Sequence, residues 1–168
     1  MPFNLLKIYN DKLELSHLTE RERNISLMGV FNRDIAENNN FKFNNKQINP
    51  TPIDGKIKID LLFTHLTTEI TDKATNKREF DIHRSCRLHW LRYHIENKKE
   101  NNMFIFSTKE PNGYRTYIYD KCEMYVIILE PLRKINEYYL LTAYNLRGKD
   151  KAKDKMMNKY KRRLPYVL

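Results

Sequence analysis

The chain has 168 residues, which is enough for one domain with a single hydrophobic core. Hydrophobic residues make up 40% of it and charged residues 31%, a balance that excludes an intrinsically disordered chain. The net charge of +10 favours an acidic partner such as nucleic acid, an anionic membrane surface or a ribosome, although the solvated surface of a Lys-rich chain would carry the same charge without any partner.

The N-terminal third is predicted to contain a helix, a long loop and a strand. Thr19 and Glu22 form a capping-box pattern, so we expect a helix from Glu20 to about Ala36. Residues 37–52 are rich in Asn and end with two prolines, which is typical of a loop. From Ile57 to Phe63 apolar residues alternate with polar ones, and this alternation predicts a strand.

A second helix is predicted over residues 77–97, and it contains an unusual arginine. Its apolar stripe consists of Phe80, Leu88, Leu91 and Ile95. Arg84 falls at the centre of this stripe, with Arg87 beside it and with His83 and Trp90 on the adjoining face. Because arginine is almost never fully buried without a partner, Arg84 is either paired or available to an anion.

The C-terminal half is predicted to be an antiparallel meander. Its strands are expected at Met103–Lys109, Arg115–Asp120, Met124–Leu129 and Tyr138–Leu146. The sequence Pro111-Asn112-Gly113 indicates a hairpin turn between the first two strands. The basic segment Lys151–Arg163 would form a terminal helix or a frayed tail.

Together these elements predict an α+β domain, in which N-terminal helices are followed by a four-stranded antiparallel sheet and a basic C-terminal tail or helix. We expect a single domain over residues 1–168, with the first helix and the Asn-rich loop in residues 1–55 and a core in residues 56–163. Helices would cover one face of the sheet and leave the other face open.

Strand periodicity predicts which side chains share the open face. Arg115, Tyr117 and Tyr119 would share one face of their strand, and Tyr138, Leu140, Thr142 and Tyr144 one face of theirs. Single-stranded RNA requires this mixture, because cations bind phosphate, flat rings stack on bases and hydroxyls bind ribose. The alternative is that the tyrosines are structural, since tyrosine is common on half-buried strands.

Other sequence features restrict the chemistry. Cys86 and Cys122 form no CxxC pair, and the histidines have no metal-ligand spacing, so neither a disulfide scaffold nor a metal site is expected. Of the histidines, His83 is the best candidate for proton transfer, because it precedes Arg84 directly. No apolar run reaches the roughly 18 residues of a membrane span, and no secretory pattern opens the chain, so we expect a cytoplasmic protein without a membrane partner.

The order of motifs resembles a known superfamily. The string Arg84-Ser-Cys-Arg87-Leu-His-Trp90, the strands with Tyr125-Val-Ile-Ile and Thr142-Ala-Tyr144, and a Lys-rich tail ending near Tyr160 resemble phage- and prophage-encoded nuclease domains of the barnase/EndoU/colicin/RelE-like (BECR) superfamily. The likeness covers about half of the chain, from Phe80 to Tyr160. It implies a four-stranded sheet and cleavage of RNA without metal or cofactor, by attack of the 2′-OH to give a 2′,3′-cyclic phosphate.

The resemblance also implies roles for individual residues and partners. Arg84 and Arg87 match the helix arginines, Thr142 and Tyr144 match the polar residues of the terminal strand, and Arg115 would face the scissile phosphate. The RNA would be tRNA, another structured RNA or ribosome-bound mRNA, with a protein inhibitor or antitoxin as a further partner. The sequence departs from active members in that no histidine falls clearly on the sheet face, and His65 would have to reach it from an earlier strand.

The leading hypothesis is therefore a small endoribonuclease. The predicted catalytic residues are His83, Arg84, Arg87, Arg115, Thr142 and Tyr144, of which His83 or Tyr144 would move the proton. The predicted RNA-binding residues are Trp90, Tyr117, Tyr119, Lys151, Lys155 and Lys159. Two alternatives remain, namely a nucleic-acid-binding phage accessory protein in which Arg84 forms a structural ion pair with Glu123 or Asp120, and a toxin-like domain that cuts only translating messages.

Overall fold

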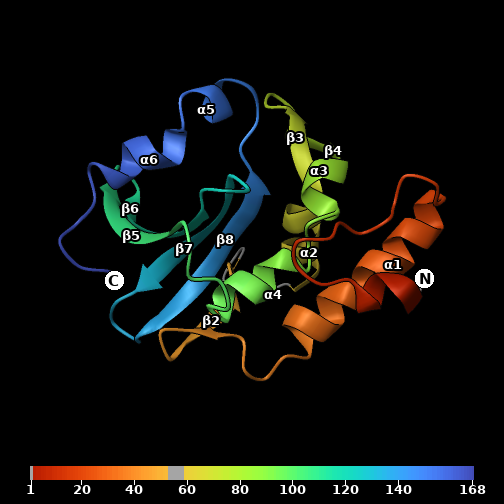
Figure 1. Cartoon of the computed structure of the whole chain (residues 1–168), viewed down its shortest axis with the longest axis horizontal. Helices are drawn as coiled ribbons and strands as arrows, with labels where there is room; N and C mark the ends of the chain where they lie inside the picture. The colour runs from red at the N-terminus through yellow and green to blue at the C-terminus, as the bar shows by residue number, and fades with distance from the viewer. Residues whose placement is uncertain (1, 53–58) are drawn as a thin grey trace.

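The computed structural model describes residues 2–52 and 59–168, and its main element is a six-stranded mixed sheet (Figure 1). The strand order is β1-β2-β8-β7-β6-β5. Their bounds are β1 Lys42–Phe43, β2 Lys46–Pro50, β5 Met103–Glu110, β6 Gly113–Asp120, β7 Tyr125–Leu132 and β8 Glu137–Asn145. Strands β5 to β8 are antiparallel neighbours, whereas β2 pairs with β8 in parallel. The prediction of a four-stranded antiparallel sheet was therefore wrong.

The extra strands come from the Asn-rich segment that was predicted to be a loop. Asn44 and Asn45 both adopt positive φ, at 50° and 60°, which is the conformation of a tight two-residue hairpin turn. This turn joins β1 to β2, and the buried Ile48 then aligns with Tyr138 of β8. Asparagine tolerates the left-handed region, so a composition typical of loops here builds a hairpin.

The helices of the described residues are short. They are the 3-10 helix η1 Pro2–Leu6, α1 Glu20–Phe31, the π-helical turn η2 Asn32–Ala36, α2 Ile59–Thr67, α3 Ile82–Ser85, α4 Trp90–Ile95, α5 Gly148–Ala152 and α6 Lys155–Tyr160. The capping box of Thr19 and Glu22 is confirmed at the start of α1. The strand expected from Ile57 to Phe63 was wrong over its described part, because α2 buries Leu62 and Leu66 one helical turn apart; residues 53–58 lie outside the described residues.

The single helix predicted over residues 77–97 was also wrong. Lys77–Phe80 forms β4, which pairs with β3 (Thr68–Asp72) in a separate two-stranded sheet. Asp81 then ends the strand and caps α3, because its carboxylate accepts the backbone N–H groups of His83 and Arg84. Phe80 and Leu88 therefore do not share a helix, and Arg84 lies on a single helical turn between β4 and α4.

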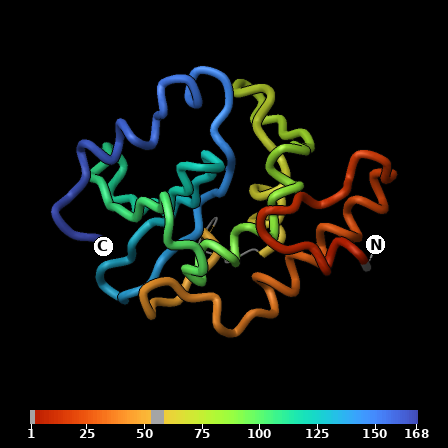
Figure 2. The backbone as a smooth tube through the Cα atoms, viewed as in Figure 1, coloured from red at the N-terminus to blue at the C-terminus, as the bar shows by residue number. Residues whose placement is uncertain are grey.

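Helices cover both faces of the large sheet (Figures 1 and 2). The main core, which includes Trp90 of α4, Ile118 and Ile127, lies between one face and the N-terminal helices. A second cluster with Phe106, Tyr117, Tyr119, Val126 and Met156 fills the space between the other face and α6. The prediction of an open face was wrong because part of the basic C-terminal segment folds into α6, which packs its buried Met156 against that face. No helix in the described ranges is long and apolar enough to cross a membrane.

Candidate functional site

The candidate site is organised by an irregularity in β8. Ile128 of β7 pairs with Thr142, but the next residue, Leu129, pairs with Leu140. Leu141 is therefore an extra residue in β8, and side chains on either side of it change faces. Tyr138 and Leu140 lie in the main core, whereas Tyr144 packs against the second cluster. The expectation that Tyr138, Leu140, Thr142 and Tyr144 share one face was wrong because simple alternation stops at this bulge.

Three adjoining hollows meet at Leu141. The arginine hollow, of about 250 Å³, is lined by His65, Glu69, Ile70, Arg78, Arg84, Leu141 and Thr142. The lysine hollow, of about 370 Å³, includes Arg115, Tyr117, Leu141, Thr142, Tyr144, Lys155 and Lys159 in its lining. The leucine hollow, of about 120 Å³, is lined by Thr51, Leu61, Leu62, His65, Leu140 and Leu141. The bulge thus sets one polar residue, Thr142, between two groups of cations.

Arg84 is the central cation of the arginine hollow. Its Nη1 donates hydrogen bonds to the carbonyl oxygens of His65 at 2.8 Å and Thr68 at 3.1 Å, and its Nε lies 3.8 Å from the Asp81 carboxylate. Its side chain is 16% exposed, and burial lowers the pKa of its guanidinium. Arg84 therefore joins α3 to the end of α2 and the start of β3, while part of it borders the hollow.

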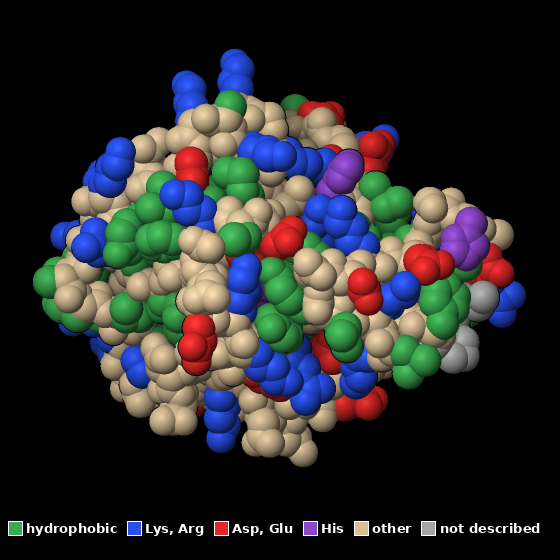
Figure 3. Space-filling model, viewed as in Figure 1, with side chains coloured by type: hydrophobic (Ala, Val, Ile, Leu, Met, Phe, Trp, Pro, Cys, Tyr) green, Lys and Arg blue, Asp and Glu red, His purple; other side chains and the backbone are tan. Residues whose placement is uncertain are grey.

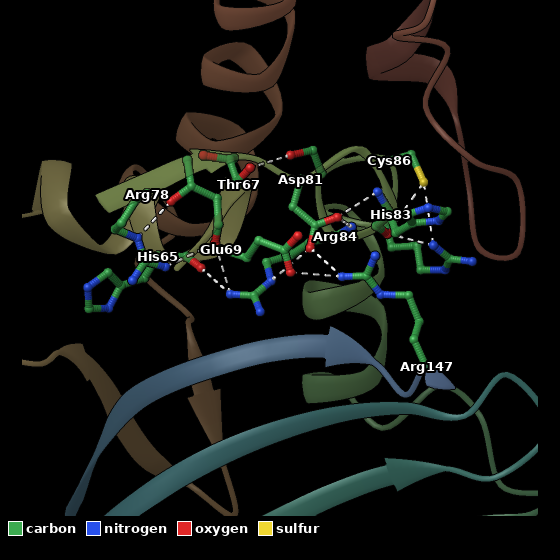
Figure 4. Close-up of polar contacts among 12 residues, drawn as sticks. His65, Thr67, Glu69, Arg78, Asp81, His83, Arg84, Cys86 and Arg147 are labelled. Atoms are coloured by element: carbon green, nitrogen blue, oxygen red, sulfur yellow. Dashed lines mark hydrogen bonds and ion pairs between the residues drawn. The ribbon is translucent and has the colours of Figure 1, made fainter. Parts of the chain in front are cut away.

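Two further arginines lie beside Arg84 (Figure 4). Arg78 donates to the Thr68 hydroxyl at 2.8 Å and to the Thr68 carbonyl at 2.9 Å. Arg147 Nη2 contacts Asp81 at 2.9 Å and Glu69 at 3.2 Å. Arg84 and Arg147 thus pair with Asp81 and Glu69, while Arg78 has no carboxylate partner among the described residues, which leaves a local excess of positive charge suited to an anion.

His65, Glu69 and Arg78 line this hollow but are not among the residues that the sequence predicted for the site, and His65 is the imidazole among them. It lies in the last turn of α2, and burial lowers the pKa of its imidazole, with the positive charges of Arg78 and Arg84 acting in the same direction. A neutral imidazole beside two arginines is a candidate proton acceptor. The Arg84 guanidinium donates to the backbone carbonyl of His65, and no local sequence pattern indicates this contact because the two residues are 19 positions apart.

The lysine hollow collects most of the predicted site residues from β6, β8 and α6. Lys159 Nζ lies 2.6 Å from Glu110 Oε1, which also accepts hydrogen bonds from Thr108 and Tyr117. Burial opposes ionisation of Glu110, but these donors lower its pKa to about 2. Lys159 is therefore neutralised by an ionised partner, and its positive charge contributes little to the hollow.

The other charged groups of the lysine hollow are less tightly paired than Lys159. Arg115 Nη1 is 3.7 Å from Glu130, a loose ion pair. Lys155 is exposed and lies 3.2 Å from Asp150. Burial raises the pKa of the Tyr144 hydroxyl, and Arg84 lies 5.6 Å from the centroid of its ring. Tyr144 therefore connects the arginine hollow with the lysine hollow.

Several predicted residues lie elsewhere. His83 is exposed and lines none of the three hollows, and Lys151 is exposed on α5. Arg87 stacks on Trp90 at 5.2 Å and donates to the carbonyl of His83. Trp90 is buried and donates to the Asp11 carbonyl. Of the site residues predicted on the helix over 77–97, only Arg84 therefore lines one of the three hollows.

The two predicted stacking tyrosines of β6 are also buried. Tyr117 is stacked on Phe106, and Tyr119 donates its hydroxyl to Asp154. Neither ring offers a free face to an RNA base in this structure. Arg84 pairs with Asp81, and neither Glu123 nor Asp120, the partners considered from the sequence, contacts it within the described residues.

Lys and Arg side chains are spread over the visible face of the molecule and alternate with Asp and Glu (Figure 3). Net charge alone therefore does not locate a site. Among the residues that the structure describes, no group of three or more His, Cys, Asp and Glu side chains is arranged to hold a metal ion. In comparisons with known proteins, no family model, no curated protein and no solved structure matches this chain.

Proposed function

We propose that this protein is an RNA endonuclease whose reaction centre is the arginine hollow. The observation that carries the proposal is the convergence of His65, Arg78, Arg84 and Thr142 on one cavity, although they come from four separate elements. This set supplies a proton acceptor, two cations and a hydroxyl, which is what cleavage by the RNA's own 2′-OH requires.

The proposed reaction uses these groups together with Tyr144, which lines the adjoining lysine hollow. His65 takes the proton of the 2′-OH, the 2′ oxygen attacks the adjacent phosphorus, and the bond from phosphorus to the 5′ oxygen breaks. The leaving oxygen takes a proton from the Tyr144 hydroxyl, and the products are a 2′,3′-cyclic phosphate and a 5′-OH. Arg84 and Arg78 stabilise the charge that develops on the phosphate, and Thr142 positions it.

As part of the same proposal, we infer that this chain is related to the BECR superfamily. Its support is the sequence pattern of Arg84 and Thr142, which line the arginine hollow, and of Tyr144, which lines the adjoining lysine hollow. The six-stranded mixed sheet departs from the four-stranded sheet that the resemblance implies. The reaction proposed above therefore rests on the side chains of the site and is independent of the fold.

A second function, binding of nucleic acid without cleavage, is favoured by one observation. Arg84 already donates to two backbone carbonyl groups, so part of its hydrogen-bonding capacity serves the fold. In this alternative the two cationic hollows would hold phosphates, and His65 would take no part in proton transfer.

The decisive test compares two His→Asn variants. Purified protein is incubated with total cellular RNA in excess EDTA, and fragment ends are mapped. Wild type is expected to give discrete fragments with 2′,3′-cyclic phosphate ends, and His65→Asn to be slower by about 100-fold or more. His83→Asn is the matched control, because His83 is exposed outside the hollows, and it is expected to cut like wild type.

The pH profile provides a second criterion. The active form of His65 is neutral, so kcat/KM should rise with pH through the lowered pKa and reach its plateau below the ordinary histidine value of about 6.5. RNA that is bound but stays intact would support the second function, and a rate unchanged by His65→Asn would reject the assigned centre.

A further inference from the structure

Arg147 lies next to the arginine hollow but does not line it. It follows Leu146, which is buried in the second cluster, and its own backbone is extended, with φ −139° and ψ 160°. Because successive side chains of an extended chain point in opposite directions, Arg147 is turned away from that cluster and toward Glu69 and Asp81 (Figure 4). Arg147 therefore acts on the hollow through the two carboxylates that it contacts.

The first of these carboxylates is shared unequally between two arginines. Asp81 Oδ2 lies 2.9 Å from Arg147 Nη2 but 3.8 Å from Arg84 Nε, which is beyond hydrogen-bonding distance. Arg84 Nε is a buried donor that has no hydrogen-bond partner in the described part of the chain, although most buried donors in proteins have one. Asp81 therefore pairs with Arg147 in preference to Arg84.

The second carboxylate belongs to the lining of the hollow itself. Glu69 lines the hollow together with Arg78 and Arg84, and its Oε2 lies 3.2 Å from Arg147 Nη2. A carboxylate in this position would repel a phosphate and attract the neighbouring guanidinium groups. Its contact with Arg147 instead places its negative charge against a cation outside the hollow, and Arg78 is left without a carboxylate partner among the described residues.

We propose that Arg147 is a positioning residue of the reaction centre, which holds Asp81 and Glu69 away from the two arginines of the hollow and so keeps their charge available to an RNA phosphate. This inference rests on the proposed function. Without Arg147, the nearest cations of both carboxylates would be Arg84 and Arg78, and the carboxylates would compete with the phosphate for them. The alternative is a structural role, in which Arg147 only ties the segment after β8 to the β3–β4 hairpin and α3.

The first test needs no RNA, because His65 reports the charge inside the hollow. Burial lowers the pKa of its imidazole, and the positive charges of Arg78 and Arg84 lower it further. In Arg147→Met the released carboxylates would offset these charges, so the pKa of His65 should rise. Adding Glu69→Gln removes one of the carboxylates and should bring the pKa back toward the wild-type value. The measurement is an NMR titration of the imidazole, whose signal is assigned by its loss in His65→Asn.

The second test measures RNA binding without cleavage. A fluorescent single strand of 2′-O-methyl RNA lacks the attacking hydroxyl, and its affinity is measured by anisotropy. Arg147→Met is expected to bind it about tenfold more weakly than wild type, and Glu69→Gln in the same chain should recover part of this loss. Arg21→Met is the matched control, because it removes the same charge from an exposed position of α1 that lines none of the three hollows, and it should bind like wild type.

A conservative variant covers the case in which Arg147→Met does not fold, which circular dichroism would show. Arg147→Lys keeps the positive charge but lacks the planar guanidinium group, so it should hold the two carboxylates less well. Its affinity for RNA and the pKa of His65 should fall between those of wild type and Arg147→Met, and Glu69→Gln should again move both values toward wild type.

The outcomes separate the two proposals. Equal affinity of Arg147→Met and Arg21→Met for RNA would overturn the positioning role while RNA binding stands. A loss of affinity that Glu69→Gln does not recover would also overturn it, because a structural role predicts no recovery. Failure of the wild type to bind RNA would overturn the proposed function, and the titration of His65 would still test whether Arg147 controls the charge in the hollow. A raised pKa and weakened binding that Glu69→Gln both reverses would support the inference.

Discussion

Asp120 is a fully buried carboxylate, and it offers a sharp test of how the sheet is held against α4. Its Oδ2 accepts from the Tyr9 hydroxyl at 2.6 Å and lies 2.9 Å from His94 Nε2, while Oδ1 lies 2.6 Å from Lys99 Nζ. His94 Nδ1 lies 2.7 Å from the Trp90 carbonyl. Both ring nitrogens of His94 thus lie within hydrogen-bonding distance of an oxygen atom.

The substitution Asp120→Asn keeps the shape of the side chain but removes its charge and one acceptor oxygen. The Lys99 ammonium group then loses its counterion at a buried site. Breaking a buried ion pair by removing one partner costs about 3–5 kcal/mol. For a chain of this length about 1 kcal/mol lowers Tm by about 2–4 °C, so the variant should melt about 6–20 °C lower.

The assay is thermal and urea unfolding followed by circular dichroism at pH 7. Asp150→Asn is the matched control, because Asp150 forms an exposed ion pair with Lys155 at 3.2 Å and should contribute about 1 kcal/mol or less. A free energy of unfolding lowered by less than about 1 kcal/mol in Asp120→Asn would refute the reasoning that this network holds the fold together.

The same network predicts a pH dependence. Burial opposes ionisation of Asp120, but hydrogen bonds from His94, Lys99 and Tyr9 outweigh it and hold its pKa well below the usual value. A lowered pKa stabilises the folded state above the unfolded value of about 3.9, and this contribution is lost as the pH falls through the folded value. The difference in Tm between wild type and Asp120→Asn should therefore shrink below about pH 4.

Two predictions concern the ends of elements. Thr19→Ala removes the hydroxyl that caps α1 and should cost about 1 kcal/mol, whereas Thr19→Asn should stay close to wild type; equal Tm values for the two variants would contradict the cap. Gly113 has φ +114° at the β5–β6 turn, so Gly113→Ala should destabilise the fold by about 1–3 kcal/mol. In α1, a Cβ added at Gly29 meets only an ordinary van der Waals contact, so Gly29→Ala should stabilise the fold by about 0.4–1 kcal/mol. Urea titrations that shifted the free energy of unfolding in the same direction for both variants would contradict this.

Capping and turn signals predicted local structure correctly, whereas the periodicity of residues 57–63 and 77–97 did not. The hairpin at Pro111-Asn112-Gly113 is confirmed by the pairing of Glu110 with Gly113, because turn residues act within a few positions of themselves. The Asn-rich composition carried a signal that was missed. Asn44, Asn45, Asn76, Asn97, Asn102 and Asn136 all adopt positive φ, so asparagine here supplies the left-handed turns that glycine usually provides, in a chain with only 4 glycines.

What could not be predicted depends on contacts distant in sequence. Whether residues 77–97 form one helix was decided by pairing of β4 with β3 and by the cap at Asp81, which compete with helical periodicity. The parallel pairing of β2 with β8 joins residues about ninety positions apart, and no window of the sequence contains both. The same holds for His65, whose place beside Arg84 follows from the packing of α2 against α3.

The bulge at Leu141 explains why simple alternation along β8 misassigned the faces of Thr142 and Tyr144. With simple alternation, Thr142 and Tyr144 would share a face with Tyr138 and Leu140, and all four would lie in one layer. One extra residue moves Thr142 and Tyr144 toward α6 and leaves Leu140 in the main core. Leu141 itself then stands at the edge of all three hollows, where the β3–β4 hairpin, α2 and α6 approach β8. Bulges are common where a strand must redirect a side chain beside a site, and here a single insertion joins an imidazole and two groups of cations around one hydroxyl.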